Sequence, residues 1–348
     1  MRWLTRDDLG AAGRSASGLL VVSPDAASVF PLGPGERADA AAMTGAALTA
    51  AGVGARDRVV VALAEPAGAL WAGAAADVAR AGASVGPRGR MRLHHALTSV
   101  GATALVATPT GAMDFLSRLH LEFLLDPLDL GLRTIVLTGE NAAKRTMAYL
   151  AKEFDAAVTE VYASPFTGAA LACRTAEEEP FVPLAEGLVG LAALGKDALD
   201  PGAGELAEVV ITPRGHAALG DAVLRTGQVS RGGLAPAHTV GEHVLVRGVW
   251  VSLLRIQKAL AKVDGVSGWK LTVSRQGTLD AAVLTVVFNR ASLVKNPMWK
   301  SRIQQAVHGL TPVQIGVEVA PEVSEAVTPG VVADLRGHHL GRDRSLAG

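Results

Sequence analysis

Few residues of this chain combine the types and spacing that chemistry requires. Two histidine pairs, His94-His95 and His338-His339, are the first candidates for a metal site. Adjacent helix positions point about 100° apart, so one ion rarely binds both rings, and we expect no metal at either pair. The second pair also lies in a polar tail from Arg336 onward that we predict to be frayed.

Three other residues could act as a nucleophile or a base. Cys173 is the single cysteine, and a lone cysteine is more often a small buried hydrophobe than a nucleophile. His216, in PRGHAALG, and His238 would be general bases only if they faced a cleft between domains. We expect exposed loop histidines instead, because no nucleophile–base pair can be recognised.

An arginine cluster is the last candidate of this kind. Arg88, Arg90 and Arg92 could hold an anionic group such as a CoA phosphate, or could simply be a solvated loop. Trp71, in an alanine-rich stretch, is expected in the core or in an oligomer contact.

The composition excludes several classes of protein. The chain has 348 residues, 49% of them hydrophobic, with 33 basic and 33 acidic side chains. A nucleic-acid binder would show a basic excess. The first ten residues, MRWLTRDDLG, carry charges where a signal peptide needs an apolar run, and apolar stretches elsewhere are too short to span a bilayer. We expect a soluble cytoplasmic protein without an internal disulfide, and the excess of Arg over Lys suggests a bacterial genome rich in G and C.

The elements that must position these residues alternate between strands and helices up to about Ser230, which predicts an α/β domain with a largely parallel sheet. The predicted strands are 58–63, 83–85, 104–107, 134–137 and 158–162, and the predicted helices are 38–51, 67–81, 93–100 and 142–154.

The character of the sequence changes after Ser230. Residues 231–236 (RGGLAP) are turn formers and predict a linker. Beyond it we expect a strand at 243–247, a helix at 253–263, a hairpin of 269–274 with 281–288, a helix at 299–307 and an edge strand at 313–319.

Eight short motifs follow one another along the chain. They are AAGVGARDRVVVAL (50–63), ADVARAGASVGP (76–87), LVATPTGAMDF (105–115), RTIVLTGE (133–140), the Tyr162 region, GEL (204–206), LRTG (224–227) and VRGVWV (246–251). In this order they resemble phenylacetate–CoA ligases, members of the adenylate-forming ligase superfamily. The resemblance implies a truncated N-terminal α/β domain over residues 1–236, without the usual helical N-terminal block, and a small, mobile α+β C-terminal domain over residues 237–348.

The resemblance also implies a reaction. ATP and a carboxylate form an acyl-adenylate, and CoA then displaces AMP. Polyphosphate requires a donor-rich glycine loop with a lysine, and magnesium requires a carboxylate ligand. An aspartate binds the ribose, and a lysine of the C-terminal domain meets the charge that develops at the α-phosphate.

The phosphate loop should fall at Ser23–Leu32, where the sequence is SPDAASVFPL. This segment has neither glycine nor lysine, and Asp25 adds negative charge where phosphates would lie. Backbone N–H groups converge on a phosphate only in conformations that favour glycine. We therefore predict that the loop is lost.

The other ATP determinants are also replaced. The magnesium glutamate falls at Phe166, which cannot coordinate a cation, and the ribose aspartate falls at Gln228, which offers only a neutral hydrogen bond. Thr239 stands where the hinge motif has arginine. No lysine precedes Lys144 or follows Lys300, so neither family lysine has a counterpart here.

Two family residues survive: Glu140, beside the adenine in the family, and Arg225, which could equally be structural. The residues of the candidate nucleotide or ligand cleft are Ser23, Glu140, Tyr162, Phe166, Arg225, Gln228 and Arg247. We predict a homologue that no longer adenylates and that binds a small carboxylate, a thioester or CoA, or else a partner enzyme. An ATP-independent acyl transferase or condensing enzyme and an atypical ligase remain the alternatives, and a homodimer is the default expectation.

Overall fold

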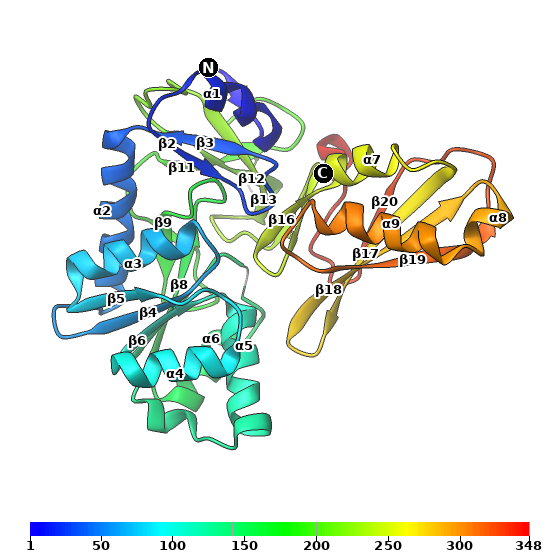
Figure 1. Cartoon of the computed structure of the whole chain (residues 1–348). Coiled ribbons are helices and arrows are strands. Elements are labelled where there is room, and N and C mark those ends of the chain that lie inside the picture. The colour runs from blue at the N-terminus through cyan, green and yellow to red at the C-terminus, as the bar shows by residue number, and fades with distance from the viewer. Residues whose placement is uncertain (141, 200, 203, 348) are drawn as a thin grey trace. The chain divides into compact units, whose positions relative to one another are not determined.

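The computed structural model describes residues 1–140, 142–199, 201–202 and 204–347 (Figure 1). By its internal contacts the chain divides into two compact units. The N-terminal unit comprises residues 1–23 and 28–236, and the C-terminal unit comprises residues 24–27 and 237–348.

A mostly parallel sheet forms the centre of the N-terminal unit. From β8 to β5 neighbouring strands run parallel, because helical crossovers join them, and β9 and β10 continue the sheet antiparallel. In spatial order the strands are β10 (Val182–Pro183), β9 (Ala170–Arg174), β8 (Ala157–Ala163), β7 (Thr134–Thr138), β6 (Ala104–Ala107), β4 (Arg58–Ala62) and β5 (Ala81–Ser84). The predicted α/β class and the strands β4, β6, β7 and β8 are confirmed.

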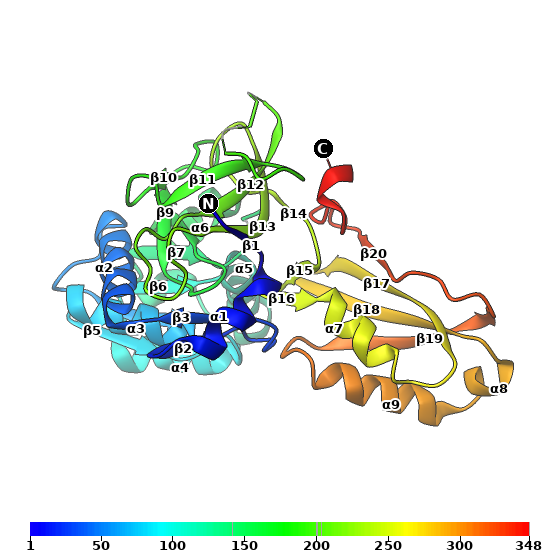
Figure 2. The same ribbon diagram turned by 90° about the horizontal axis from the view of Figure 1, so that it is seen from above.

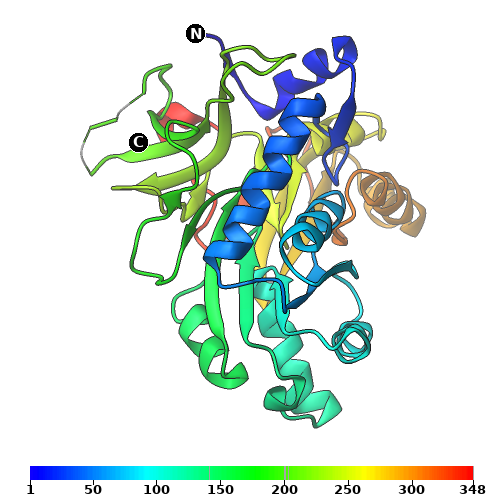
Figure 3. The ribbon, with the colours of Figure 1, turned by 90° about the vertical axis from the view of Figure 1, so that its left-hand side faces the viewer.

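Helices cover both faces of this sheet. Alternate residues of a strand point to opposite faces, so Val60 packs with α4, α5 and α6 while Val59 and Val61 pack with α2 and α3. Figure 3 shows α2 and α3 in front of the strands. The helices are α2 (Pro34–Ala50), α3 (Ala67–Val78), α4 (Arg90–Val100), α5 (Pro109–Arg118), followed by η2 (Leu119–Phe123) and η3 (Pro127–Leu130), and α6 (Thr146–Phe154).

A second layer of the N-terminal unit was not predicted. In it β11, β12 and β13 form an antiparallel sheet that β1 joins in parallel, and β2 and β3 form a hairpin. Apolar side chains of the hairpin and this sheet share a core with the ends of β8 and β9. The elements are β1 (Trp3–Leu4), η1 (Arg6–Asp8), α1 (Leu9–Ser15), β2 (Leu19–Val22), β3 (Val29–Leu32), β11 (Val189–Ala193), β12 (Leu206–Ile211) and β13 (Val223–Arg231).

The C-terminal unit has its own sheet and core (Figure 2). Its strand order is β19-β18-β17-β20, and the predicted hairpin is β17 with β18. Leu253, Ile256 and Leu260 bury one face of α7, as their spacing predicted. The elements are β14 (His238–Thr239), β15 (His243–Val246), β16 (Val249–Ser252), α7 (Leu253–Leu260), β17 (Val266–Gln276), β18 (Leu279–Phe288), α8 (Ala291–Val294), α9 (Pro297–His308), β19 (Ile315–Val323), β20 (Val331–Asp334) and η4 (Arg344–Leu346).

Two sequence predictions about the elements of the fold are wrong. The helix expected from Ala142 begins at Thr146, because Arg145 adopts a left-handed conformation and the Glu177 carboxylate accepts the N–H groups of Arg145 and Met147. The tail from Arg336 is not frayed, since the Arg336 side chain is only 5% exposed and pairs with two aspartates.

Candidate functional site

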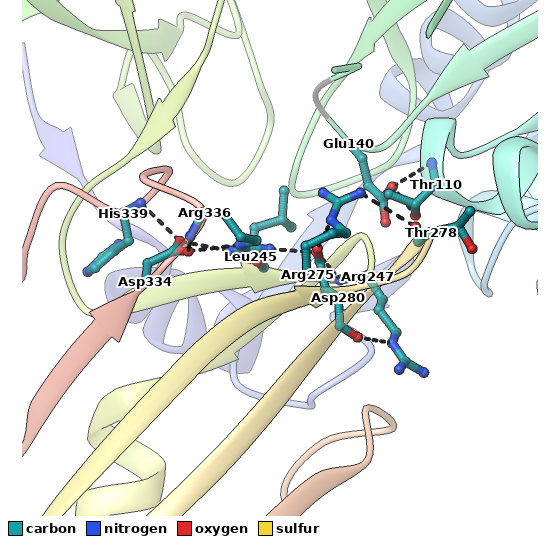
Figure 4. Close-up of polar contacts among 10 residues, drawn as sticks. All are labelled: Thr110, Glu140, Leu245, Arg247, Arg275, Thr278, Asp280, Asp334, Arg336 and His339. Carbon is teal, nitrogen blue, oxygen red and sulfur yellow. Dashed lines mark hydrogen bonds and ion pairs between the residues drawn. The ribbon is translucent and has the colours of Figure 1, made fainter. Parts of the chain in front are cut away.

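Glu140 follows β7 at the carboxyl edge of the parallel sheet, where open α/β sheets bind their ligands. Its carboxylate accepts the Thr110 N–H, at 3.1 Å, and the Thr110 hydroxyl (Figure 4). Thr110 lies in the first turn of α5, where the helix dipole stabilises a negative charge. The surviving glutamate is thus held by its own unit, and its place beside a nucleotide base stays a prediction.

A buried ion pair positions the loop that carries Glu140. The Arg174 guanidinium donates twice to Glu160 Oε2, at 2.6 and 2.8 Å, and Glu160 Oε1 accepts the Ala142 N–H at 3.1 Å. Sequence reasoning missed these residues. The available signal was a glutamate inside the apolar run of β8, because a buried carboxylate requires a partner.

The segment aligned with the phosphate loop is the turn of the β2–β3 hairpin. The Ser23 N–H donates to the Ser28 carbonyl at 3.0 Å, and the Ser28 N–H donates to Ser23 Oγ at 3.0 Å. The Ala27 N–H donates to the Asp25 carboxylate at 3.1 Å. These three amides are therefore engaged inside the turn rather than directed at an anion, and polyphosphate does not fit this loop.

Phe166, where the resemblance places the magnesium glutamate, is part of the apolar core. Its ring is 5% exposed and stacks on Phe30, with centroids 5.7 Å apart. The Arg6 guanidinium lies 5.0 Å from the centroid of the Phe166 ring and donates to the Pro165 carbonyl at 3.0 Å. Two aromatic rings and a cation cannot bind Mg²⁺, which requires oxygen ligands. The residues present do not fit the metal.

His216 is enclosed by the same core and is not an exposed loop residue, which corrects the sequence prediction. Its ring is 5% exposed and meets Phe30 edge-on, with centroids 5.4 Å apart. Its Nδ1 accepts the N–H groups of Ala218 and Leu219 at 3.2 and 3.3 Å. Its Nε2 is buried and has no hydrogen-bond partner among the described residues. With Nδ1 engaged and Nε2 enclosed, His216 is unsuited to act as a general base.

Tyr162 and Gln228 are in direct contact. The Tyr162 hydroxyl donates to Gln228 Oε1 at 2.7 Å, and both side chains are buried. Burial raises the pKa of Tyr162 above its ordinary value, so the phenol remains a donor at neutral pH. The oxygen of Gln228 that could replace the ribose aspartate is thus already bonded within the protein.

Arg225 is the centre of a buried network between β12 and β13. Its Nη1 lies 2.7 Å from Glu208 Oε2, and the two side chains are 6% and 0% exposed. Glu208 Oε1 accepts the Gly227 N–H at 2.8 Å, and the Trp3 ring centroid lies 4.8 Å from the guanidinium carbon. This geometry favours the structural interpretation of the second surviving family residue.

Arg247 belongs to the C-terminal unit, in the tight turn between β15 and β16. It has a positive φ of 51°, which is uncommon for a side chain larger than glycine or asparagine. Its N–H donates to the Asp280 carboxylate at 3.3 Å, and its Nε donates to the Asp280 carbonyl at 2.5 Å (Figure 4).

Of the cleft residues in the N-terminal unit, the structure therefore brings Tyr162 into contact with Gln228 and places Phe166 in the same apolar cluster as Tyr162. Ser23, Glu140 and Arg225 each take part in a separate local network.

The remaining candidates have structural roles. Arg90 pairs with Asp114, and Arg92 donates to the Val85 carbonyl, so these two arginines are not a free anion site. Burial raises the pKa of the Cys173 thiol, the opposite of what an activated nucleophile requires.

Trp71 and His238 are equally accounted for. Trp71 is fully buried and donates to the Gly168 carbonyl at 2.8 Å, while His238 Nδ1 lies 3.1 Å from the Gly337 carbonyl.

Among the described residues, no group of three or more His, Cys, Asp or Glu side chains is arranged to hold a metal ion. No described helix is long and apolar enough to cross a membrane.

His339 should make the stability of the C-terminal unit sensitive to acid. Burial lowers the pKa of His339 from 6.5 to about 4. The nearby carboxylates of Asp334 and Glu242 oppose this shift, whereas the cations of Arg336 and Arg342 add to it. The folded state therefore resists a proton that the unfolded state accepts. This contribution is fully present above pH 6.5 and is lost as the pH falls toward 4, by roughly 2–3 kcal/mol.

Urea unfolding of the C-terminal unit at several pH values between 7.5 and 4.5 measures this effect. His339→Asn, which keeps a polar atom toward Thr239, should remove most of the extra acid sensitivity. His308→Asn, at an exposed position, is the matched control and should leave it unchanged. An identical pH profile for wild type and His339→Asn would contradict the assignment.

Similarity to known proteins lies in the fold. No protein-family model and no curated protein matches the sequence. A 2-hydroxyisobutyryl-CoA ligase, in complex with 2-HIB-AMP and CoA, matches with a TM-score of 0.77 at 14% identity, over 96% of this chain and 80% of the ligase chain. Amide bond synthetase McbA from Marinactinospora thermotolerans matches with a TM-score of 0.64 at 16% identity, over 89% and 66%. Malonyl-CoA ligase, with methylmalonyl-CoA and AMP bound, matches with a TM-score of 0.57 at 19% identity, over 83% and 67%.

This chain has the adenylate-forming ligase fold. The fold expected from the order of its motifs is therefore confirmed. An adenylate-forming fold does not by itself set the chemistry, because function resides in the residues of the site. Several residues at the expected ATP and magnesium positions differ from those that the resemblance implies.

Proposed function

We propose that this chain is a non-adenylating relative of the acyl-CoA ligases. In this proposal it binds a small acyl or aryl carboxylate, a thioester or CoA, or associates with a partner enzyme, without activating a carboxylate through ATP. The observation that supports this most directly is Phe166, which stacks on Phe30 beneath Arg6 where a magnesium carboxylate is expected.

The charges of the site support the same proposal. Removing one preorganised electrostatic element typically costs roughly 10²–10³ in rate. Here the loop lysine, the magnesium ligand, the ribose aspartate and the C-terminal lysine are all replaced. Asp25 further adds a negative charge in the turn aligned with the phosphate loop. Residual adenylation would have to arise from residues outside the family pattern.

An ATP-independent enzyme in the same cleft is less well supported. His216 is enclosed, and Cys173 is not activated, so neither offers a nucleophile or a base for acyl transfer. We therefore propose binding rather than catalysis. We also propose a reducing, cytoplasmic setting, because the single cysteine cannot form an internal disulfide.

Calorimetry with ATP–Mg²⁺, AMP, CoA and acyl-CoA thioesters tests the proposal, together with pyrophosphate release across a panel of carboxylates. We expect no ATP–Mg²⁺ binding up to about 1 mM and no carboxylate-dependent pyrophosphate, because the segment aligned with the phosphate loop has neither glycine nor lysine. The 2-hydroxyisobutyryl-CoA ligase serves as the positive control for the assay. Micromolar binding of ATP–Mg²⁺ with carboxylate-dependent pyrophosphate release would make this chain an atypical ligase.

A further inference from the structure

The first residues of the C-terminal unit are paired with the end of the chain. The Thr239 N–H donates to the His338 carbonyl at 2.7 Å, and the Leu340 N–H donates to the Thr239 carbonyl at 2.9 Å, which makes a parallel bridge between Thr239 and His339. Two residues further on, the Gly241 N–H donates to the Gly341 carbonyl at 2.9 Å. Residues 238–241 thus have a backbone partner within their own unit.

Side chains reinforce this pairing. The Arg342 guanidinium forks onto the Glu242 carboxylate, with N–O distances of 2.7, 3.0 and 3.1 Å. Thr239 Oγ1 lies 3.1 Å from His339 Nδ1. Such a bidentate pair adds geometric specificity to the backbone hydrogen bonds.

Gly241 permits a close approach in the same region. It has a φ of 95°, which favours glycine, and a Cβ built there would lie 3.0–3.1 Å from three atoms of the Arg344 guanidinium. Any larger residue at this position would therefore strain the backbone and displace Arg344.

The other end of the paired segment is anchored in the body of the unit. Arg336 forms ion pairs with Asp280, at the start of β18, and with Asp334, at 2.8 Å, and it donates to the Leu245 carbonyl at 2.8 Å. Figure 4 shows Arg336 between the two aspartates. Asp334 also accepts the His339 N–H at 3.1 Å. These contacts anchor the start of residues 336–344 in the C-terminal unit, so the backbone that pairs with residues 238–242 is held at both ends of the pairing.

We propose that residues 336–344 form a strap that holds residues 237–242, the first residues of the C-terminal unit after 24–27, in one conformation within that unit. Solved structures of the 2-hydroxyisobutyryl-CoA ligase are described as a thioesterification state, a postadenylation state and an open conformation, so a ligase of this fold changes state. In this chain, a pivot within residues 238–242 would have to break three backbone hydrogen bonds and a bidentate ion pair. Any such pivot would therefore lie outside residues 238–242.

Hydrogen–deuterium exchange of the full chain, resolved to single residues, tests the strap. The amides of Thr239, Gly241 and Leu340 should exchange slowly. In Arg342→Glu, which places like charges together, they should exchange at least about tenfold faster. Because Arg342 and Glu242 are both partly exposed, the substitution should leave the core folded.

The charge-swapped pair is the matched control. Combining Arg342→Glu with Glu242→Arg should restore slow exchange, and Arg342→Gln should give an intermediate rate. Amides of Leu284 and Val286 in the buried β18 report that the unit remains folded in every variant. Fast exchange of the three amides in the wild type, or rates unaffected by Arg342→Glu and Arg342→Gln in a folded unit, would overturn the proposal. The assay uses no nucleotide, so its failure is independent of the proposed function.

Discussion

Replacing Arg225 with alanine should lower the free energy of unfolding of the N-terminal unit by about 3–5 kcal/mol. The reason is the burial of both partners, since Glu208 is fully enclosed and would keep a carboxylate without its cation. The variant also loses the hydrogen bond from Arg225 to the carbonyl of Lys196 and its stacking on Trp3. Chemical denaturation followed by circular dichroism measures this change in the free energy of unfolding.

Two further variants sharpen this measurement. Arg231→Ala removes an exposed arginine from the end of the same strand and should cost less than about 1 kcal/mol. Adding Glu208→Gln to Arg225→Ala should recover part of the loss, because the uncompensated charge is then removed. A loss below about 1 kcal/mol for Arg225→Ala would mean that the buried pair contributes little, and would revive a ligand-binding role for this arginine.

Replacing Phe166 with alanine should cost about 3–5 kcal/mol, because the ring fills space between Phe30, Arg6 and their neighbours. A residue kept only for a metal site would behave differently, since removing such a side chain barely changes the stability of the unliganded protein. The size of the loss therefore separates a core position from a vestigial ligand position. Thermal and denaturant unfolding of the purified variant are the measurements.

Tyr149→Ala is the control for Phe166→Ala, because that ring is 43% exposed on α6 and its loss should cost under about 1 kcal/mol. Phe166→Leu, which keeps most of the apolar volume, should cost less than the alanine variant. Equal stabilities of Phe166→Ala and Tyr149→Ala would show that the Phe166 ring is not part of the core.

The sequence predicted which residue types stand at the expected site positions, but not what those side chains contact. A phenyl ring where magnesium is expected is visible without a structure, as is the absence of glycine and lysine at Ser23–Leu32. The sequence could not show that the Phe166 ring stacks on Phe30, or that the oxygen of Gln228 is already bonded to Tyr162. Those contacts join residues 136 and 66 positions apart, and no local pattern encodes such distances.

The sequence by itself determined strands β4 to β8 of the sheet and helices α2, α3 and α4, because short apolar runs and helical periodicity follow from which faces must be buried. It also determined the family resemblance through the order of its motifs. Only the tertiary structure decided which charges pair in the interior, such as Glu160 with Arg174 and Asp280 with Arg336. The predicted frayed tail failed for this reason. A polar segment is disordered only if its charges remain solvated, and whether Arg336 finds buried partners depends on the fold of strands more than 50 residues away.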